Sequence, residues 1–518
     1  MGRIFKIGAA LLIAGSIIVS CGTNANSSHS TVGSSVSPCT TFPIKSFSST
    51  MFPTGTISSS GRWLTDSSSR VVMLHGVNVV AKDAPYYPCA FGFNQSDVAW
   101  LSGLGMEVVR LGVLPSGEMP TRGKIDQSYI ANLMATVNEL SNEHIYILLD
   151  WHQDNYGTFF DEPGTNFRAD GMPSWMTLID NKKNVQVAFP YSYAENPALQ
   201  QAFQSFWDNQ LVPGGKSIQD YYLEMLQAVA KEVSGNPWVL GYEVMNEPWP
   251  GVNWTSCVLS ASGCPNEDKS ELDAFYQKAA LSIREVDKNH MIFIEPFSSF
   301  NYGIPTSITS PPGVKNVGLA FHQYAQTPLG EQGVFTNALN WSNANGGALL
   351  NTEWSANNND PATISSQAEI ADSNLASWTY WLFDNCDIAC SKANGVNMLF
   401  NPFKAPTGSN VESAVVANLV RPYPFVISGT PTSLSFDPTS KVMDFTWSTT
   451  KANNAGRFGP GSLTSIETPS NVYPTGYTAV VIGGKVISKP CSPMLEIEQN
   501  QVLSQLSLTV KPSGSCSS

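Results

Sequence analysis

Short apolar runs recur along the chain, and each is about as long as one β-strand. Eight of them lie between residues 71 and 384, separated by longer stretches of helical character. They begin at Val71, Val108, Ile145, Val239, Met291, Val317, Ala348 and Trp378. Alternating strands and helices are typical of a parallel sheet, and eight such units predict a closed (β/α)8 TIM barrel.

The pattern changes after about Arg421, where short β-rich runs alternate with turn residues. This alternation of short β-rich runs and turn residues predicts a C-terminal β-sandwich domain. The helical pattern before it is clearest in residues 125–143 and 269–288. The predicted segments are a targeting segment at 1–20, a polar tether at 21–50, the barrel at 51–420 and the sandwich at 421–518.

Polar and aromatic residues gather at the C-terminal ends of the predicted strands. In a TIM barrel these ends form one face, and active sites lie there. The residues are His75, Asn78, Arg110, Asp150, His152, Asn246, Glu247, Glu295, His322, Tyr324, Glu353 and Trp381. A random distribution would not place so many polar residues at one end of the strands, so the pattern predicts an active site.

Two glutamates carry the predicted chemistry. Glu247 follows the fourth predicted strand and Glu353 follows the seventh. Hydrolysis of a glycosidic bond needs one carboxylic acid to protonate the leaving oxygen. It needs a second carboxylate to attack the anomeric carbon or to activate water. Carboxyl groups roughly 5–5.5 Å apart would indicate retention of anomeric configuration, and roughly 6.5–9.5 Å would indicate inversion.

Neighbouring residues fit the same chemistry. Asn246 could bind a sugar 2-hydroxyl, and Tyr324 could hold Glu353 as a nucleophile. Arg110 could pair with a carboxylate and keep it ionised. Trp381 could stack on a sugar ring. Each of these roles assumes that the strand ends meet around one pocket.

Other interpretations of these residues stay open. Glu295 also follows a strand and is a competing carboxylate, whereas Glu243 lies within a strand and is predicted to form a structural ion pair with an arginine. His152 and His322 could be hydrogen-bonded core residues, and Trp381 could be core packing.

Charge and cysteine content narrow the possible partners. The net charge of -13 argues against nucleic acid, because phosphate binding needs a basic surface. No cysteine pair has histidines at zinc-ligand spacing, so no metal and no cofactor are expected. The sequence does not indicate an oligomeric state.

The N-terminal segment has a basic start at Arg3 and Lys6 and then an apolar stretch that ends at Cys21. This arrangement resembles a bacterial lipoprotein signal, which implies that Cys21 is lipidated and anchors the chain to a membrane. The expected location is the bacterial cell surface, or the medium if the protein is secreted. An ordinary secretory signal with an incidental cysteine is the alternative.

Eight cysteines follow Cys21, an even number that allows four disulfides in an exported chain. Two pairs are close enough in sequence to bond locally, and two further pairs use the remaining cysteines. The predicted pairs are Cys257 with Cys264, Cys386 with Cys390, Cys39 with Cys89, and Cys491 with Cys516.

Several motifs resemble a known family. Asn246-Glu247-Pro248 and Thr352-Glu353-Trp354 resemble the acid/base and nucleophile motifs of glycoside hydrolase family 5. "LHGVNVVAKDAPYYP", "LLDWHQD", "MNEPWPG", "FHQY" and "RPYPFVISGTP" together resemble its endoglycoceramidase branch. That branch cleaves the bond between oligosaccharide and ceramide in glycosphingolipids. The resemblance covers nearly the whole chain after Cys21, including the C-terminal sandwich.

The resemblance assigns roles residue by residue. It implies that Glu247 is the acid/base and Glu353 the nucleophile, in a double displacement without a cofactor. It further implies substrate-binding residues and two supporting residues, Arg110 and His322. The substrate-binding residues would be Lys82, Asp150, His152, Asn246, Tyr324 and Trp381.

Trp151 and Ser355 depart from the family pattern, in which methionine and then glycine or alanine are expected. Both positions lie near the chemistry without taking part in it. They put details of the substrate in doubt rather than the reaction.

A long aromatic segment, residues 156–207, supports a lipid-linked substrate. It would be either a wall for an acyl chain or a structural insertion with its own small core. The alternative enzymes are a glucosylceramide or steryl β-glucosidase and an endo-β-1,4-glucanase. A surface glycan-binding protein without catalysis is the alternative from another class.

Overall fold

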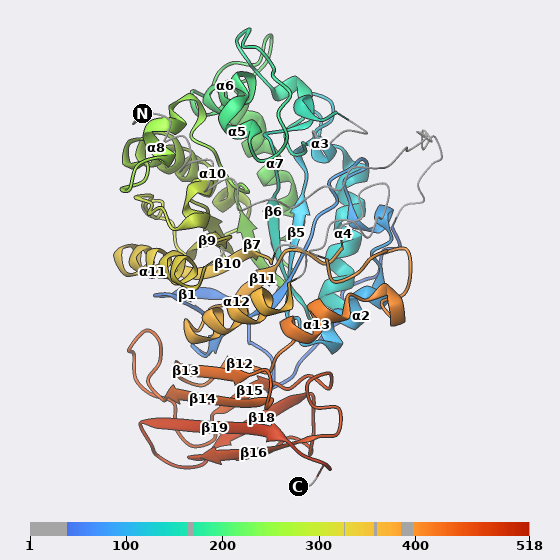
Figure 1. Ribbon diagram of the computed structural model, residues 1–518, viewed down its shortest axis with the longest axis vertical. Coiled ribbons are helices and arrows are strands. Elements are labelled where there is room, and N and C mark those ends of the chain that lie inside the picture. The colour runs from blue at the N-terminus through green and yellow to red at the C-terminus, as the bar shows by residue number, and fades with distance from the viewer. Residues whose placement is uncertain (1–38, 163–168, 326, 357–359, 385–396, 517–518) are drawn as a thin grey trace.

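A computed structural model describes residues 39–162, 169–325, 327–356, 360–384 and 397–516. Eight parallel strands close into a barrel in the order β10-β11-β4-β5-β6-β7-β8-β9, which confirms the predicted TIM barrel (Figure 1). Their bounds are β4 His75–Val79, β5 Val108–Val113, β6 Tyr146–Trp151, β7 Val239–Glu243, β8 Met291–Ile294, β9 Val317–Gln323, β10 Ala348–Trp354 and β11 Trp378–Tyr380.

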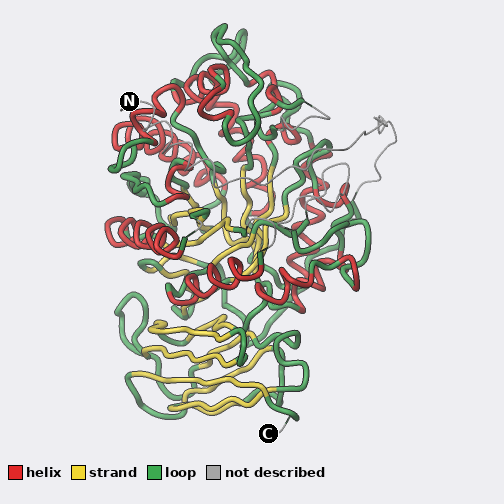
Figure 2. Tube along the Cα trace, in the orientation of Figure 1, coloured by secondary structure: helices red, strands yellow, loops and turns green. Residues whose placement is uncertain are grey.

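Helices surround the barrel strands, as the red and yellow segments of Figure 2 show. The α-helices are α2 Gln95–Gly103, α3 Pro115–Glu118, α4 Gln127–Asn142, α5 Ser192–Glu195, α6 Pro197–Trp207, α7 Ile218–Val233, α8 Trp254–Val258, α9 Pro265–Glu267, α10 Ala274–Val286, α11 Pro328–Asn345, α12 Pro361–Ser373 and α13 Ser413–Leu419. The 3-10 turns are η1 Pro88–Phe91, η2 Thr158–Phe160, η3 Ser174–Met176, η4 Gly251–Asn253, η6 Ser298–Tyr302 and η9 Gly408–Asn410, and η5 Asp268–Asp273 is a π-helix.

Side chains fix where the main helices begin. Asp126 precedes α4 and accepts hydrogen bonds from the backbone N–H groups of Ser128 and Tyr129. Asp360 caps α12 in the same way, and Thr327 caps α11. Capping of this kind satisfies N–H groups that have no partner within the helix. The residues before α4, α11 and α12 therefore specify where these three helices start.

The first predicted strand is in fact two strands. β3 Val71–Val72 pairs with β12 Tyr423–Ile427 outside the barrel, and β4 starts only at His75. The apolar run is continuous because the residues of β3, of β4 and of the link between them are buried. Periodicity reports burial and not the partner strand, so it could not reveal this change of sheet.

Two antiparallel sheets form the C-terminal domain, which lies beneath the barrel in Figure 1 and confirms the predicted sandwich. One sheet has the order β1-β2-β3-β12-β15-β18-β17 and the other β13-β14-β19-β16. The first three strands, β1 Ser58–Ser60, β2 Trp63–Thr65 and β3, come from before the barrel. The others are β13 Thr430–Asp437, β14 Val442–Ser448, β15 Leu463–Glu467, β16 Tyr477–Ile482, β17 Gly484–Val486, β18 Met494–Gln499 and β19 Gln505–Pro512.

Three of the predicted disulfides are present: Cys39–Cys89, Cys257–Cys264 and Cys491–Cys516. The fourth predicted pair, Cys386 with Cys390, lies outside the described residues, as does Cys21. Within the described ranges, no helix is both long and apolar enough to cross a membrane.

The aromatic segment at residues 156–207 is mostly a small core. Phe159 and Phe189 are each 38% exposed, whereas most of the other aromatic and Met side chains are buried. The buried set is Tyr156, Phe160, Met172, Met176, Tyr193, Phe203, Phe206 and Trp207. Phe167 lies outside the described residues. The burial of these side chains favours the structural interpretation for the body of the segment.

Candidate active site

Arg110 lies at the centre of the polar strand ends and is fully buried. Its guanidinium donates to both oxygens of Glu243, at 2.8 and 2.9 Å, and to Glu353 Oε2 at 3.0 Å. It also donates to Asn246 Oδ1 at 2.7 Å and lies 3.1 Å from Asp150 Oδ1. The ion pair predicted for Glu243 is therefore confirmed, and one arginine connects strands β5, β6, β7 and β10.

Glu353 lies in β10 and is held by two donors. Tyr324 donates its hydroxyl to Oε1 at 2.5 Å, and Arg110 binds Oε2. Burial raises the pKa of Glu353 and the Glu247 carboxylate adds to that, whereas His322 and Arg110 favour the ionised form. The contacts that were predicted for Tyr324 and Arg110 are present.

Glu247 lies four residues beyond the end of β7. Its backbone adopts φ 40°, a left-handed conformation that is costly for a residue with a side chain. Its Oε1 accepts from Asn301 Nδ2 at 2.6 Å and lies 2.8 Å from His322 Nδ1. The strained turn thus aims the carboxylate back over the barrel.

The two glutamates face each other across a short gap. One carboxylate oxygen of Glu247 and one of Glu353 lie within 4.8 Å of each other. This close approach matches the shorter carboxyl separation of retaining hydrolases and not the wider one of inverting hydrolases. The arrangement suits a retaining mechanism, in which one carboxylate attacks a sugar carbon and the other transfers a proton.

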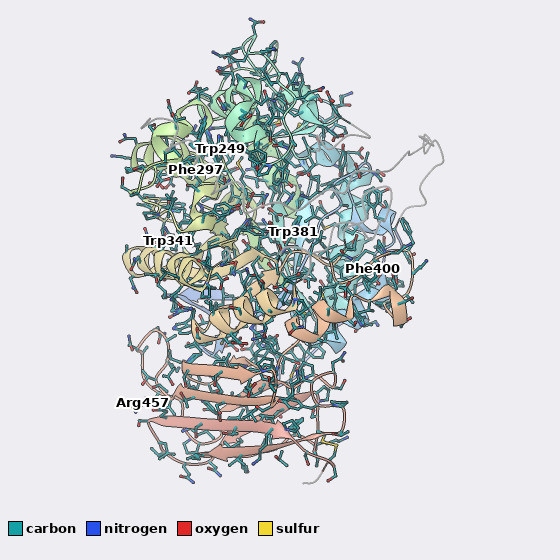
Figure 3. All side chains as sticks on the ribbon, viewed as in Figure 1. Trp249, Phe297, Trp341, Trp381, Phe400 and Arg457 are labelled. Carbon is teal, nitrogen blue, oxygen red and sulfur yellow. A yellow bond between two sulfur atoms is a disulfide. The ribbon has the colours of Figure 1, made fainter. Side chains whose placement is uncertain are left out.

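A second group of side chains forms one wall beside Glu353. The ring of Trp381, near the centre of the barrel in Figure 3, is stacked with the imidazole of His152 at a centroid distance of 5.5 Å and an interplanar angle of 9°. Lys82 Nζ lies 4.6 Å from the Trp381 ring centroid. An indole face beside charged groups is the combination that binds a sugar ring and its hydroxyls.

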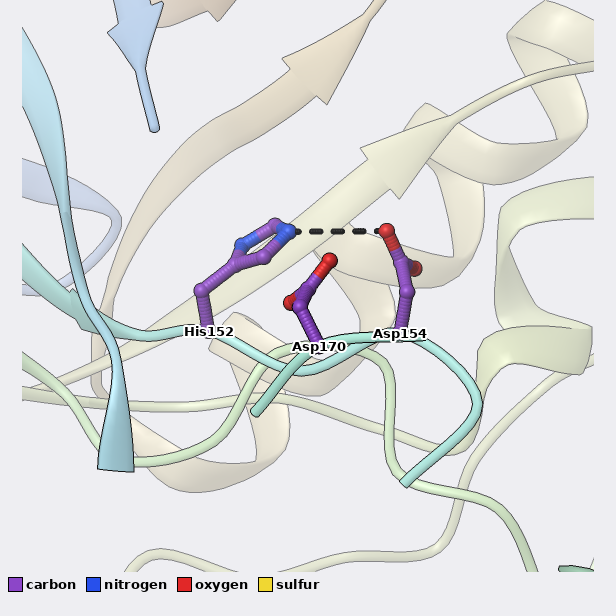
Figure 4. Close-up of side chains that lie close together, drawn as sticks. All are labelled: His152, Asp154 and Asp170. Atoms are coloured by element: carbon purple, nitrogen blue, oxygen red, sulfur yellow. Dashed lines mark ion pairs between the residues drawn. The ribbon is translucent and has the colours of Figure 1, made fainter. Parts of the chain in front are cut away.

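Charge balance in this wall argues against a metal ion. His152, Asp154 and Asp170 approach one another closely enough to suggest metal ligands, and Figure 4 shows the His152–Asp154 ion pair at 3.7 Å. However, the Lys82 ammonium is bonded to Asp154 and lies 3.8 Å from Asp170. A lysine already supplies the positive charge that a metal would bring.

Asp150 and Glu295 are both held by neighbouring polar groups. Asp150 is fully buried, with Oδ2 at 2.7 Å from His152 Nδ1 and Oδ1 at 3.1 Å from the Arg110 guanidinium. Glu295 is also fully buried, and its Oε2 accepts the backbone N–H of Glu247 at 2.9 Å. The competing carboxylate therefore supports Glu247 from behind and does not line the open site.

Four contributing residues were not selected from the sequence. Asp154 and Gln153 follow His152 in the quoted "LLDWHQD", where their position at a strand end was the available signal. Gln153 donates to the backbone carbonyls of Asn246 and Glu247, at 2.8 and 2.9 Å. Asp170 comes from a loop and Asn301 from the short 3-10 turn η6, neither with a recognisable sequence pattern, so only the folded chain brings them to the site. The four are Gln153, Asp154, Asp170 and Asn301.

Replacing Arg110 by methionine is expected to destabilise the fold severely. The change would leave three buried carboxylates, those of Asp150, Glu243 and Glu353, without their cation. Breaking a buried ion pair on one side costs roughly 3–5 kcal/mol. Urea unfolding would measure the loss, and Arg457→Met, at an exposed arginine of the sandwich, is the control expected to change stability by less than about 0.5 kcal/mol. An equal effect of both changes would contradict the central role of Arg110.

Stability is expected to fall between pH 6.5 and about 9 because of His152. Burial alone lowers the pKa of this imidazole, but Asp150 raises it above the ordinary 6.5 to about 9. A raised folded-state pKa means that the contribution is complete below pH 6.5 and is lost as pH rises through 9. The full loss would be about 3 kcal/mol. Urea unfolding at several pH values should show that the free energy of unfolding declines less with rising pH in His152→Gln than in the wild type. Parallel curves for the two proteins would contradict the raised pKa of His152.

Comparison with known families adds to the geometry. The family model "Cellulase (glycosyl hydrolase family 5)" matches residues 69–387, and the model "Glycoside hydrolase family 5 C-terminal domain" matches residues 421–510. Together they span the barrel strands and most of the sandwich.

Three relatives illustrate the range of similarity. "Endoglycoceramidase I" of Rhodococcus hoagii is 29% identical over 470 residues, covering 85% of each chain. The solved structure of "Endo-glycoceramidase II from Rhodococcus sp.: Lactosyl-Enzyme Intermediate" has a TM-score of 0.70 at 22% identity, covering 87% of this chain and 99% of its own. A "Glucosylceramidase" of Cryptococcus neoformans is 27% identical over 249 residues, which is 38% of this chain and 33% of its own.

Proposed function

Because the chain belongs to glycoside hydrolase family 5, we propose that it hydrolyses the β-glycosidic bond between the oligosaccharide and the ceramide of glycosphingolipids, with retention of configuration. The single observation that carries the mechanism is the pair of glutamate oxygens within 4.8 Å, between Arg110 and Tyr324 on one side and His322 on the other. The similarity to Endoglycoceramidase I over 85% of both chains supports the substrate class.

In the first step, Glu353 attacks the anomeric carbon of the first sugar. Glu247 gives its proton to the ceramide oxygen, so the glycosidic bond breaks and free ceramide leaves. Arg110 and Tyr324 fix the attacking carboxylate, and Glu353 becomes an ester of the sugar. Lys82 and His152, whose charges act on Glu353, and Trp381, whose ring lies against both of them, would hold that sugar.

In the second step, Glu247 is a carboxylate and accepts a proton from water. The water oxygen attacks the same anomeric carbon, the ester bond to Glu353 breaks, and the intact oligosaccharide is released as a β-hemiacetal. Two inversions at one carbon give net retention. Both glutamates return to their starting protonation states.

A β-glucosidase acting on glucosylceramide is the second candidate. The partial match to a glucosylceramidase favours it, but that match spans 38% of this chain, against 85% for Endoglycoceramidase I. An endoglycoceramidase must accept an extended glycan, whereas the glucosidase requires only a terminal glucose. The endoglycoceramidase therefore releases lactose from lactosylceramide, whereas the glucosidase leaves this substrate intact because its terminal sugar is galactose.

Incubation of the purified chain from Ser37 onward with GM3 ganglioside, lactosylceramide, glucosylceramide and carboxymethyl cellulose would test the proposal. The expected products are intact oligosaccharide and free ceramide, detected by mass spectrometry, and their loss in Glu353→Ala. Cleavage of glucosylceramide alone would indicate the glucosidase, and cleavage of cellulose alone a glucanase. A folded protein that cleaves none of them would support the glycan-binding alternative.

The N-terminal resemblance extends the proposal to location. Lipidation of Cys21 would hold the enzyme at a bacterial surface, where lipid-linked glycans are accessible. Metabolic labelling with an alkyne fatty acid should tag the full chain but not Cys21→Ser. Labelling of both, or of neither, would contradict a lipid anchor at this residue.

A further inference from the structure

We propose that Glu295 and Asn301 form a clamp that positions Glu247 as the acid/base; the inference rests on the proposed function and deepens it. Both residues come from the segment that starts at the end of β8 and continues into η6. Neither was identified from the sequence as an aid to Glu247. Three sets of contacts support the clamp.

The first set holds the backbone. The Glu247 N–H donates to Glu295 Oε2 at 2.9 Å, and the Ser298 N–H donates to the Pro248 carbonyl at 3.1 Å. Glu247 itself has φ 40°, a conformation that costs a non-glycine residue about 1–2 kcal/mol. Because this conformation is unfavourable in isolation, contacts on both sides of the residue are needed to keep it. The Glu295 carboxylate supplies the one on the N–H side.

The second set fixes the carboxylate. Asn301 Nδ2 lies 2.6 Å from Glu247 Oε1, and His322 Nδ1 lies 2.8 Å from the same oxygen. With two donors on Oε1, the acidic proton belongs on Oε2. An acid that is held by one oxygen presents its proton from the other, toward the glycosidic oxygen of the substrate.

The third set makes His322 a donor. Its Nε2 lies 3.5 Å from Glu295 Oε1, and both atoms are buried without another hydrogen-bond partner among the described residues. Glu243 Oε1 faces the same nitrogen at 3.9 Å, and Glu353 Oε2 faces Nδ1 at 3.9 Å. Burial alone lowers the pKa of His322, but Glu295 and Glu353 raise it well above 6.5.

The protonation state of the His322–Glu295 pair determines which oxygen of Glu247 carries the acidic proton. Burial raises the pKa of Glu295 well above its ordinary value, with His322 opposing that shift and the Glu243 and Glu247 carboxylates adding to it. The hydrogen bond from the Glu247 N–H favours the carboxylate form. We assign the proton to His322 because its Nδ1 then donates to Glu247 Oε1. A neutral imidazole could instead offer a lone pair at Nδ1. Glu247 would then carry its proton on Oε1 and donate it to His322. That proton could not be transferred to the glycosidic oxygen of the substrate.

The test compares two leaving groups in Glu295→Gln and Asn301→Ala. Lactosylceramide has a poor leaving group that needs a proton, whereas 2,4-dinitrophenyl β-lactoside has one that does not. In each variant, kcat/KM for lactosylceramide should fall about 10- to 100-fold, and kcat/KM for the aryl lactoside less than about 3-fold. A distortion of the whole site would lower both values by the same factor.

Two control variants provide the comparison for this selectivity between leaving groups. Glu331→Gln changes another buried carboxyl group, in α11, and should alter neither rate constant. Glu247→Ala should show the same selectivity with a larger loss. Equal losses for both substrates, or no loss in either folded variant, would overturn the clamp. If Glu295→Gln fails to fold by circular dichroism, Asn301→Ala decides.

Failure of the proposed function would give a different result. The wild-type chain would then leave lactosylceramide intact. The clamp would be tested with aryl β-glucosides or β-lactosides of graded leaving-group pKa, choosing whichever the wild type hydrolyses. The clamp predicts that log kcat/KM depends more steeply on leaving-group pKa in the variants than in the wild type, and an unchanged slope overturns it.

Discussion

Glu353→Ala is expected to reduce kcat/KM for lactosylceramide by about 10⁴-fold or more. The variant lacks the oxygen that attacks the anomeric carbon, and no other carboxylate replaces it. Glu243 is bonded to Arg110 through both oxygens, and Glu295 is fully buried behind Glu247. A discontinuous assay that quantifies released ceramide would measure the loss.

Added azide makes this prediction specific to the nucleophile. In Glu353→Ala, azide can occupy the vacated space and displace the leaving group of 2,4-dinitrophenyl β-lactoside directly. One displacement inverts the configuration, so the product should be α-lactosyl azide, identified by NMR. An Arg110→Lys variant would not test the nucleophile alone, because the Arg110 guanidinium also binds Glu243 and Asn246. A β-lactosyl azide from Glu353→Ala would contradict its assignment.

Glu247→Ala is expected to discriminate between leaving groups. For lactosylceramide, kcat/KM should fall about 10²- to 10⁴-fold, because the ceramide oxygen departs without a proton. For 2,4-dinitrophenyl β-lactoside, kcat/KM should change little, while kcat falls because no base activates water in the second step. Stopped-flow measurement should therefore show a burst of dinitrophenol that is followed by slow turnover.

Azide again provides the complementary outcome. In Glu247→Ala it should attack the glycosyl ester on Glu353 and yield β-lactosyl azide, the product of two inversions. The two variants thus give opposite anomers if the roles are as assigned. Matching anomers, or a Glu247→Ala variant equally impaired on both substrates, would contradict the division of roles between Glu247 and Glu353.

The barrel was predictable because its strands are buried on both faces and its helices are periodic. Arg110, Glu247, Tyr324 and Glu353 were predictable as a set because parallel strands bring their C-terminal ends to one face. The family resemblance then assigned roles that spacing alone left open between Glu247 and Glu295. Residue type and position at a strand end were therefore enough to find the centre of the site.

The missed features depend on contacts between distant segments. Periodicity joined β3 to β4 because both are buried, although β3 pairs with β12 some 350 residues later. Asn301 reaches Glu247 from η6, a short 3-10 turn that has no recognisable periodic pattern in the sequence. The positive φ of Glu247 also has no local signal, since it is imposed by neighbours such as Glu295 and not by a glycine.

The measurement that tests the central claim most directly is proton NMR of lactosylceramide hydrolysis in the first minutes, before the sugar mutarotates. The account predicts β-lactose as the first water-soluble product, with ceramide released in equal amount. That result requires both an intact glycan and two inversions at its anomeric carbon. Galactose as the first sugar would contradict cleavage at the ceramide bond, and α-lactose would contradict the paired action of Glu247 and Glu353.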